Sequence, residues 1–142
     1  MASELDTTAS PWKPRLAHVM LRVKDLDRSL EFYVGALGMR ILRQKEYPDG
    51  QFTNTFLAYG PEAEFPAIEL TYNWGRQEPY DLGNGYGHVC LDVDDVYGFC
   101  EHLAKAGVTI TRPPGPMKHG TRVIAFVTDP DGYKVEITQP YE

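Results

Sequence analysis

The chain has 142 residues, enough for one compact domain or for two small modules that pack together. Hydrophobic residues make up 42% of it and charged residues 24%, close to the composition of ordinary soluble proteins. The net charge of −6 argues against a surface for nucleic acid or anionic membranes, which would need a basic patch, and no apolar run is long enough to span a bilayer.

Residues 1–14 are expected to form a flexible N-terminal tail, because they are rich in Ser, Thr and Pro. They carry acids early and lack an apolar core, so they do not resemble a secretory signal. Cys90 and Cys100 are the two cysteines, without a CxxC pair or the spacing of a disulfide framework. We therefore expect a reduced, cytoplasmic protein.

A first module is predicted over residues 15–80. It opens with an alternating strand at 17–23, after which Asp25 offers an N-cap for a helix. The apolar stripe of this helix ends at Leu37, and Gly38 can close it in a left-handed turn. Three short strands are expected next, at 39–46, 52–59 and 67–72.

A second module is predicted over residues 85–140. A strand at 87–93 is followed by Asp94 and Asp95, which offer N-cap oxygens, and by a helix that ends at Gly107. The sequence 129–132, Asp-Pro-Asp-Gly, is typical of a turn between the last two strands. The strands expected in this half are 108–111, 121–128 and 134–138.

The two modules repeat one another. His18 superposes on His88 and Asp25 on Asp95 at an offset of 70 residues. Further along, residues 57–59 match 124–126, and Glu69 matches Glu136, at an offset of 67. The predicted fold is α+β, with duplicated βαβββ modules whose curved mixed sheets form a shared pocket.

Histidine and glutamate coincide in the two halves. Glu69 and Glu136 each lie between two apolar neighbours in a strand, so each points to the opposite face from them. If that face lines a closed sheet, the carboxylate is buried and must be paired or bind a metal. Together with His18 and His88, the two carboxylates suit a divalent ion such as Ni, Co, Zn, Mn or Fe.

Each of these residues also has an ordinary explanation. A single His in a strand is more often structural than a ligand, and a Glu between apolar neighbours usually marks the solvent side. The coincidence of both residue types in both halves is what favours a metal site. No set of thiolates accompanies them, so a structural zinc site is not expected.

Polar groups further along the same strands suggest where a substrate binds. Arg22 is four residues after His18, and Asn73 is four after Glu69, which places each about 13 Å from a ligand on the same face. That spacing suits an extended ligand of tripeptide size with a carboxylate near Arg22. Alternatively, Arg22 pairs with a surface acid and Asn73 only ends a strand. Lys118 lies in the Gly- and Pro-rich segment 113–120, which is either a flap over an anionic ligand or an ordinary hairpin loop.

Several stretches resemble bacterial glyoxalase I, of the vicinal-oxygen-chelate superfamily, over nearly the whole chain after the tail. The sequences ELTYNWG and FVTDPDGYKVEI together are specific for that family within the superfamily. The others are HVMLRVKDLDRSLEFYVGALGMRIL, FLAYGPE, YGHVCLDVDDV and GPMKHGTRVIAFV.

The resemblance implies an enzyme, a lactoylglutathione lyase, that isomerises the hemithioacetal of methylglyoxal and glutathione to S-D-lactoylglutathione through an enediolate. It implies one divalent metal per site, acting as a Lewis acid, and a homodimer with sites at the interface. Glu136 is the implied catalytic base. The implied metal ligands are His18, Glu69, His88 and Glu136, and the substrate-binding residues are Arg22, Asn73, His88 and Lys118.

The sequence differs from the zinc-dependent enzymes of this family in features that help to predict which metal ion it binds. The stretch 83–87 lacks the Arg that zinc enzymes often carry before the second His, and His119 stands where relatives usually have Gly. The first ligand is His18 rather than Gln, and the connection from Trp74 to His88 is short. Both features resemble the nickel- and cobalt-activated branch, so nickel is the expected ion, with cobalt next and zinc third.

Two other functions compete with this interpretation. An extradiol dioxygenase of the same superfamily would use two His and one Glu on Fe(II), but the second Glu and the Arg22–Asn73 arrangement weigh against it. A metal-free, drug-sequestering binding protein of this fold would need no aligned His and Glu set, so analysis of bound metal would distinguish it.

Overall fold

The computed structural model describes residues 8–140. Its first half contains β1 (His18–Val23), α1 (Leu26–Leu30), η1 (Glu31–Ala36), β2 (Arg40–Tyr47), β3 (Phe52–Ala58) and β4 (Ala67–Asn73). Its second half contains β5 (His88–Asp92), α2 (Val96–Lys105), β6 (Thr109–Pro116), β7 (Val123–Thr128) and β8 (Lys134–Thr138).

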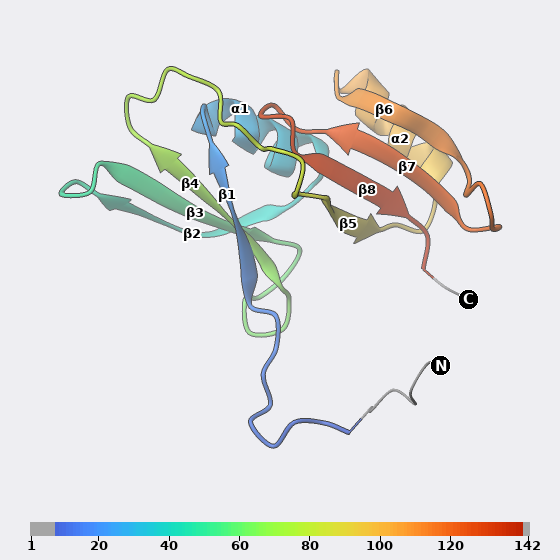
Figure 1. Cartoon of the computed structure of the whole chain (residues 1–142), viewed down its shortest axis with the longest axis horizontal. Helices are drawn as coiled ribbons and strands as arrows, with labels where there is room; N and C mark the ends of the chain where they lie inside the picture. The colour runs from blue at the N-terminus through green and yellow to red at the C-terminus, as the bar shows by residue number, and fades with distance from the viewer. Residues whose placement is uncertain (1–7, 141–142) are drawn as a thin grey trace.

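Each half forms its own four-stranded sheet (Figure 1). The strand order is β1-β4-β3-β2 in the first and β5-β8-β7-β6 in the second. In both, the first pair is parallel and the remaining pairs are antiparallel. The prediction of duplicated βαβββ modules in an α+β fold is confirmed.

The helix boundaries follow from the residues that the sequence placed there. Asp25 has an extended backbone and accepts a hydrogen bond from the Arg28 amide at 3.2 Å, and Asp95 does the same for the Gly98 amide at 3.1 Å. Gly38, with φ of 79°, and Gly107, with φ of 81°, lie in the left-handed region just beyond the helices. Both N-caps and both glycine ends are therefore confirmed.

The first helix differs from the expected regular α-helix. After Leu30 it continues as the π-helix η1, and the Leu37 amide bonds to the Phe32 carbonyl, five residues back, at 2.9 Å. The segment from Asp25 to Gly38 is one residue longer than the equivalent segment from Asp95 to Gly107. A π turn accommodates one extra residue per turn, so it absorbs this insertion without displacing the strand that follows.

The strand register corrects the predicted alignment of the repeat. Phe56 pairs with Glu69 in the first sheet and Phe126 pairs with Glu136 in the second, so Phe56 is the counterpart of Phe126. The expected match of residues 57–59 with 124–126 is wrong. The three-residue difference between the modules lies after these strands, where the connection 59–66 is three residues longer than 129–133.

The loop expected at 113–120 is partly strand. β6 extends to Pro116 and pairs with β7 through two irregularities in register, and the turn between them is confined to residues 117–122. Four carbonyl oxygens accept hydrogen bonds from the Arg112 guanidinium, which holds the bulged backbone in place. They belong to Pro113, Gly115, Pro116 and Ile124, at 2.7 to 3.2 Å.

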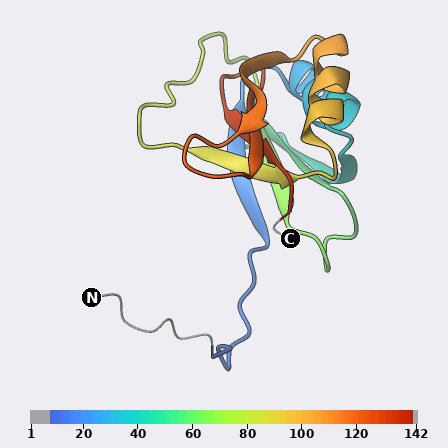
Figure 2. The same ribbon diagram turned by 90° about the vertical axis from the view of Figure 1, so that its right-hand side faces the viewer.

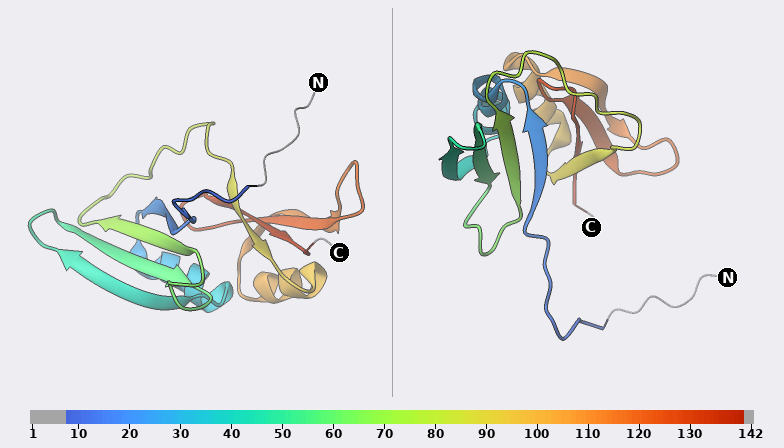
Figure 3. Two further views of the ribbon diagram at one scale, coloured as in Figure 1. Left: turned by 90° about the horizontal axis from the view of Figure 1, so that it is seen from below. Right: turned by 60° about the vertical axis from the view of Figure 1, so that its left-hand side comes forward.

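One hydrophobic core joins the two modules. Buried strand residues such as Leu57 and Leu70 of the first half and Val135 and Ile137 of the second belong to the same cluster. The helices lie on one side of the sheets (Figure 3). The His102 ring nitrogen lies 3.0 Å from the Ala36 carbonyl oxygen, which links α2 to the end of η1. Packing the helices against one face of each sheet leaves the opposite faces open.

The described part of the N-terminal segment, residues 8–17, contains neither helix nor strand and leads away from the sheets (Figure 2). Residues 1–7 of the predicted tail lie outside the described residues. Within residues 8–140, no helix is long and apolar enough to cross a membrane.

Candidate metal centre

The open face of each sheet carries the polar side chains that strand alternation predicts. On β1, Leu21 and Val23 are buried in the core, whereas His18 and Arg22 lie on the other face. On β4, Glu69 lies on the same open face, because it is the register partner of Met20, two residues from His18.

The first sheet brings His18 and Glu69 together. Their Nε2 and Oε2 atoms are 3.0 Å apart, and the two side chains are 39% and 14% exposed. The Phe56 ring from β3 packs edge-to-face against the His18 ring at 5.2 Å between centroids. The Glu69 carboxylate is therefore largely removed from water and is oriented by the His18 imidazole. We refer to the phenylalanine that packs against the histidine, here Phe56, as the aromatic wall.

The second sheet repeats this arrangement with its own residues. His88 Nε2 and Glu136 Oε2 are 2.8 Å apart, with side-chain exposures of 39% and 18%. The Phe126 ring lies edge-to-face against the His88 ring, again at 5.2 Å. Each His–Glu–Phe set thus has the same geometry in the two halves.

The four predicted metal ligands form two separate pairs within one chain. Across residues 8–140, no three or more His, Cys, Asp or Glu side chains lie together as a metal site would require. Each pair offers one imidazole nitrogen and one carboxylate oxygen, and both sit on an open face. The donors fit a borderline divalent ion, and each pair supplies half of a four-ligand set.

The two aromatic walls were not predicted from the sequence. With the repeat shifted to an offset of 67 in that region, Phe56 had no aromatic counterpart. The correct offset of 70 aligns it with Phe126 and would have revealed the match.

In each half an arginine is the register partner of the phenylalanine that packs against the ligand histidine, but the two arginines have different hydrogen-bond partners. In the first module the Arg43 guanidinium lies 3.6 Å from the centre of the Phe56 ring and forms a bidentate pair with Glu62, with contacts of 2.9 to 3.3 Å. This hydrogen-bonded pair lowers the pKa of Glu62. In the second module Arg112 is the register partner of Phe126, and the hydrogen bonds found for its guanidinium go to carbonyl groups.

The expected substrate residues of the first module occupy the open face. The side chain of Arg22 makes no ion pair with any residue in the described range, so the alternative of a pair with a surface acid is not observed there. Asn73 ends β4, and its amide donates a hydrogen bond to the Tyr80 hydroxyl at 2.9 Å. Both remain on the same face as His18 and Glu69.

Lys118 is exposed in the turn between β6 and β7, beside His119. Cys90 shares the open face of β5 with His88 and is the register partner of Glu136. Burial, and then the charge of Glu136, raise the pKa of the Cys90 thiol to about 11. A thiol with so high a pKa is a poor nucleophile near neutral pH.

The turn that precedes β8 holds the two modules together. The buried Asp129 carboxylate accepts a hydrogen bond from the Tyr33 hydroxyl at 2.7 Å and from the Tyr133 amide at 2.8 Å. The Tyr133 hydroxyl in turn donates to the Arg22 carbonyl at 2.9 Å. We refer to Tyr33, Asp129 and Tyr133 as the clasp. It connects the start of the strand that carries Glu136 to the strand that carries Arg22.

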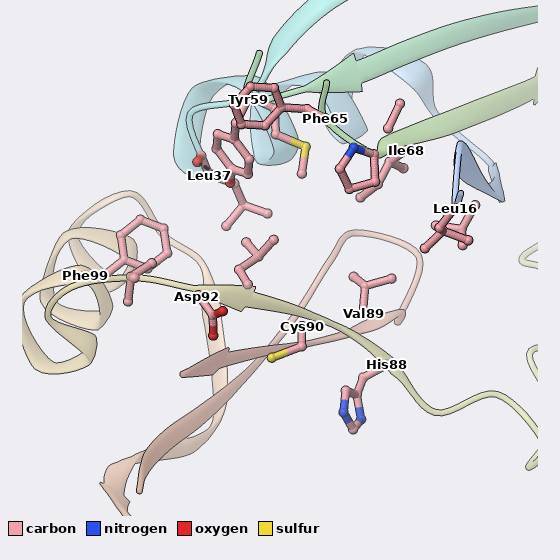
Figure 4. Close-up of a pocket in the computed structure, with 16 residues that line it drawn as sticks. Leu16, Leu37, Tyr59, Phe65, Ile68, His88, Val89, Cys90, Asp92 and Phe99 are labelled. Carbon is pink, nitrogen blue, oxygen red and sulfur yellow. Dashed lines mark hydrogen bonds between the residues drawn. The ribbon is translucent and has the colours of Figure 1, made fainter. Parts of the chain in front are cut away.

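A large apolar cleft of roughly 870 Å³ lies between the modules, and His88, Val89 and Leu91 of β5 are among the residues that line it (Figure 4). Val89 points into it, whereas the neighbouring His88 ring is turned away, as strand alternation requires. Leu16, 68% exposed, and Phe65, 40% exposed, contribute to its wall. An apolar surface of this kind is typical of a protein–protein contact.

Comparison with known proteins agrees with this arrangement. A family model described as the Glyoxalase/Bleomycin resistance protein/Dioxygenase superfamily matches residues 15–137. A probable lactoylglutathione lyase of Synechocystis sp. is 57% identical over 124 residues, which cover 87% of this chain and 94% of that protein. The lactoylglutathione lyase of Neisseria meningitidis serogroup A is 55% identical, over 88% of this chain and 90% of the relative.

The crystal structure of glyoxalase I from Zea mays superposes with a TM-score of 0.86 at 47% identity. It covers 90% of this chain, which spans only 45% of the maize chain. The chain thus belongs to the Glyoxalase/Bleomycin resistance protein/Dioxygenase superfamily, as its paired βαβββ sheets and its two matched His–Glu pairs indicate. Within that superfamily it groups with the lactoylglutathione lyases, the glyoxalase I enzymes.

Proposed function

We propose that this chain is a metal-dependent lactoylglutathione lyase that converts the hemithioacetal of methylglyoxal and glutathione into S-D-lactoylglutathione. The observation that carries the proposal is the duplicated pair of His and Glu on open sheet faces, at 3.0 Å and 2.8 Å, with equal aromatic neighbours. The activity detoxifies methylglyoxal, a reactive aldehyde. We place it in the reducing cytoplasm, in keeping with the free thiols of Cys90 and Cys100.

The metal would be held by His18, Glu69, His88 and Glu136. A divalent ion bound there supplies Lewis-acid chemistry, drawing electron density from the substrate oxygens. Nickel is the proposed ion, with cobalt next and zinc third, because the first ligand is an imidazole and the connection from Trp74 to His88 is short.

A homodimer would complete the site, with one pair from each subunit. Three observations support this assembly. The two pairs do not meet in one chain, each sheet leaves its ligand face open, and the apolar cleft exposes side chains such as Leu16 to solvent. A two-fold axis would then generate two equivalent sites.

Glu136 is the proposed base. Its carboxylate takes the proton from the carbon that bears the sulfur and returns it to the neighbouring carbon, which was the ketone. The hydroxyl proton of the first carbon also moves to the oxygen of the second, so the first carbon becomes the thioester carbonyl, the second becomes an alcohol, and oxidation and reduction balance within the substrate. Phe126 and the His88 ring hold the carboxylate in place and limit its contact with water, so the carboxylate does not have to reorganise during the transfer.

Substrate contacts are assigned to both halves. Arg22 and Asn73 face the same side as Glu69 and would bind the polar groups of the glutathione moiety. Across the interface, His88 would contact the reacting end and Lys118, from the turn between β6 and β7, would approach an anionic group.

A thioester assay with methylglyoxal and glutathione on metal-reconstituted protein tests the activity, and absence of thioester formation would contradict it. Mixing His18→Ala with Glu136→Gln tests the shared site. Under free subunit exchange half the dimers are hybrids with one intact site of two, so about a quarter of wild-type activity should return. Mixing His18→Ala with Glu69→Gln is the matched control and should restore nothing, because both sites of that hybrid carry a lesion.

A further inference from the structure

The two modules differ in charge at the position beside the ligand histidine. In the first sheet the register partner of His18 is Ala67, which is buried against Phe56 and Ala58. In the second sheet the register partner of His88 is Lys134, which is exposed. A position that is sealed by an apolar side chain in one half therefore holds a cation in the other.

This lysine lines a separate pocket of roughly 360 Å³ on the open face of the second sheet. The pocket is bounded by Tyr86, Gly87, His88, Thr111, Arg112, Phe126 and Lys134. Lys134 is two residues before Glu136 on the same face, so its backbone lies about 7 Å along the strand from the proposed base. The pocket is thus adjacent to the proposed reaction centre.

The positive charge of this pocket is not neutralised. The Lys134 ammonium makes no hydrogen bond or ion pair with any residue in the described range 8–140. Arg112 donates to four neutral carbonyls, whereas its counterpart Arg43 is neutralised by Glu62. Glu136, two residues along β8 on the same face, is already engaged by His88. Two uncompensated cations in a chain of net charge −6 form a local anion-attracting site.

We propose that the pocket formed by Lys134 and Arg112 beside His88 binds a carboxylate of the substrate. Lys134 is the direct partner, because its ammonium is free, and Arg112 contributes charge from a fixed position. The proposal rests on the proposed function, since it adds a specificity-determining residue to the same site. The carboxylate comes either from the glutathione moiety or from the side chain of the 2-oxoaldehyde, and the same chemistry recognises both.

The test replaces Lys134 with Met, which keeps the length of the side chain and removes its charge. Lys105→Met is the control, because Lys105 is 77% exposed on α2 and pairs only with the surface residue Glu101. The first probe is S-methylglutathione, which cannot react, compared with its glycine monoester by calorimetry on the full-length protein. The second is turnover of 4,5-dioxopentanoate, an oxoaldehyde with a terminal carboxylate, compared with its methyl ester.

If the carboxylate belongs to glutathione, Lys134→Met should weaken binding of S-methylglutathione about tenfold or more and leave binding of the ester unchanged. If it belongs to the aldehyde, the variant should lower kcat/KM by at least about tenfold for the acid only. Lys134→Arg, which keeps the positive charge, should retain most of the wild-type binding of S-methylglutathione or, in the second case, most of the wild-type kcat/KM for the acid. Equal behaviour of acid and ester in both comparisons, or an equal loss in Lys105→Met, would overturn the proposal. Failure of the wild-type protein to turn over methylglyoxal with glutathione would instead contradict the proposed function. The calorimetric comparison would still test whether the pocket binds a carboxylate.

Discussion

The Tyr33 hydroxyl and the Asp129 carboxylate, which come from opposite modules, are joined by a hydrogen bond of 2.7 Å inside the core. Burial raises the pKa of Asp129 even though hydrogen bonds from Tyr33 and from two backbone amides act to lower it. Burial and the charge of Asp129 raise the pKa of Tyr33 as well, so Tyr33 is the donor at any ordinary pH. The contact fixes the second module's last strand, with Glu136, relative to the first module.

Tyr33→Phe should destabilise the fold by about 1–3 kcal/mol, because it leaves a buried carboxylate one donor short. Urea unfolding at fixed protein concentration measures the loss. Tyr97→Phe, on the exposed side of α2, is the control and should lie within about 0.5 kcal/mol of wild type. Equal stabilities of wild type and Tyr33→Phe would show that the clasp contributes little.

The stability of the clasp should depend on pH in a defined direction. Because the folded-state pKa of Asp129 is raised, its contribution is fully present below the pKa of the unfolded chain and is lost as the pH rises through the folded-state pKa. Asp129→Asn removes this titration. The free energy of unfolding of wild type relative to that variant should therefore fall as the pH rises above about 4, the ordinary pKa of an Asp side chain. Parallel pH profiles for the two proteins would contradict the raised pKa.

Glu136→Gln should lower turnover by at least about a hundredfold, because an amide cannot accept the substrate proton. Metal content should be largely retained, since three ligands remain, and elemental analysis of the purified variant checks this. Glu101→Gln, at a surface position on α2, is the control and should keep wild-type turnover. Near wild-type activity of Glu136→Gln would remove it from the role of base.

Nickel or cobalt should activate the chelated protein at least about tenfold better than zinc. The reason is the imidazole of His18 at the first ligand position and the connection between β4 and β5, which has neither helix nor strand. Add-back of each ion to the same apo preparation, with bound metal measured in parallel, makes the comparison. Zinc activity equal to nickel activity at equal occupancy would assign the chain to the other branch.

Much of the fold was accessible from the sequence because its signals are local. Asp25, Asp95, Gly38 and Gly107 mark helix ends through capping and backbone chemistry, and alternation around Glu69 marks the open face. The π turn was not predicted, because a hydrophobic stripe looks nearly the same at both helical periods. The Phe56–Phe126 match was missed because strand register depends on pairing across the sheet rather than on neighbours in sequence.

The candidate ligands come from the repeat, which places one His and one Glu in each module, and their role in metal binding stays a prediction. The repeat identified His18, Glu69, His88 and Glu136, and the structure places each on its open face as two pairs. The clasp through Tyr33 and Asp129, which lie far apart in the sequence, could not have been derived from spacing. The charge at Lys134 looks ordinary in the sequence, since only the register with His88 shows what it lies beside.

The length differences between the modules have a consequence for how the chain can be engineered. They fall in the π turn of η1, in the bulge between Arg112 and Gly115, and in the connection before the last strand. None falls within β1, β4, β5 or β8, which carry the His and Glu residues. The extra residues lie where the backbone can absorb them locally, so the His and Glu positions of the two halves stay at equivalent places in their sheets. A loop grafted into the largely exposed connection 59–66 should therefore be tolerated far better than a single residue added to any of the four strands.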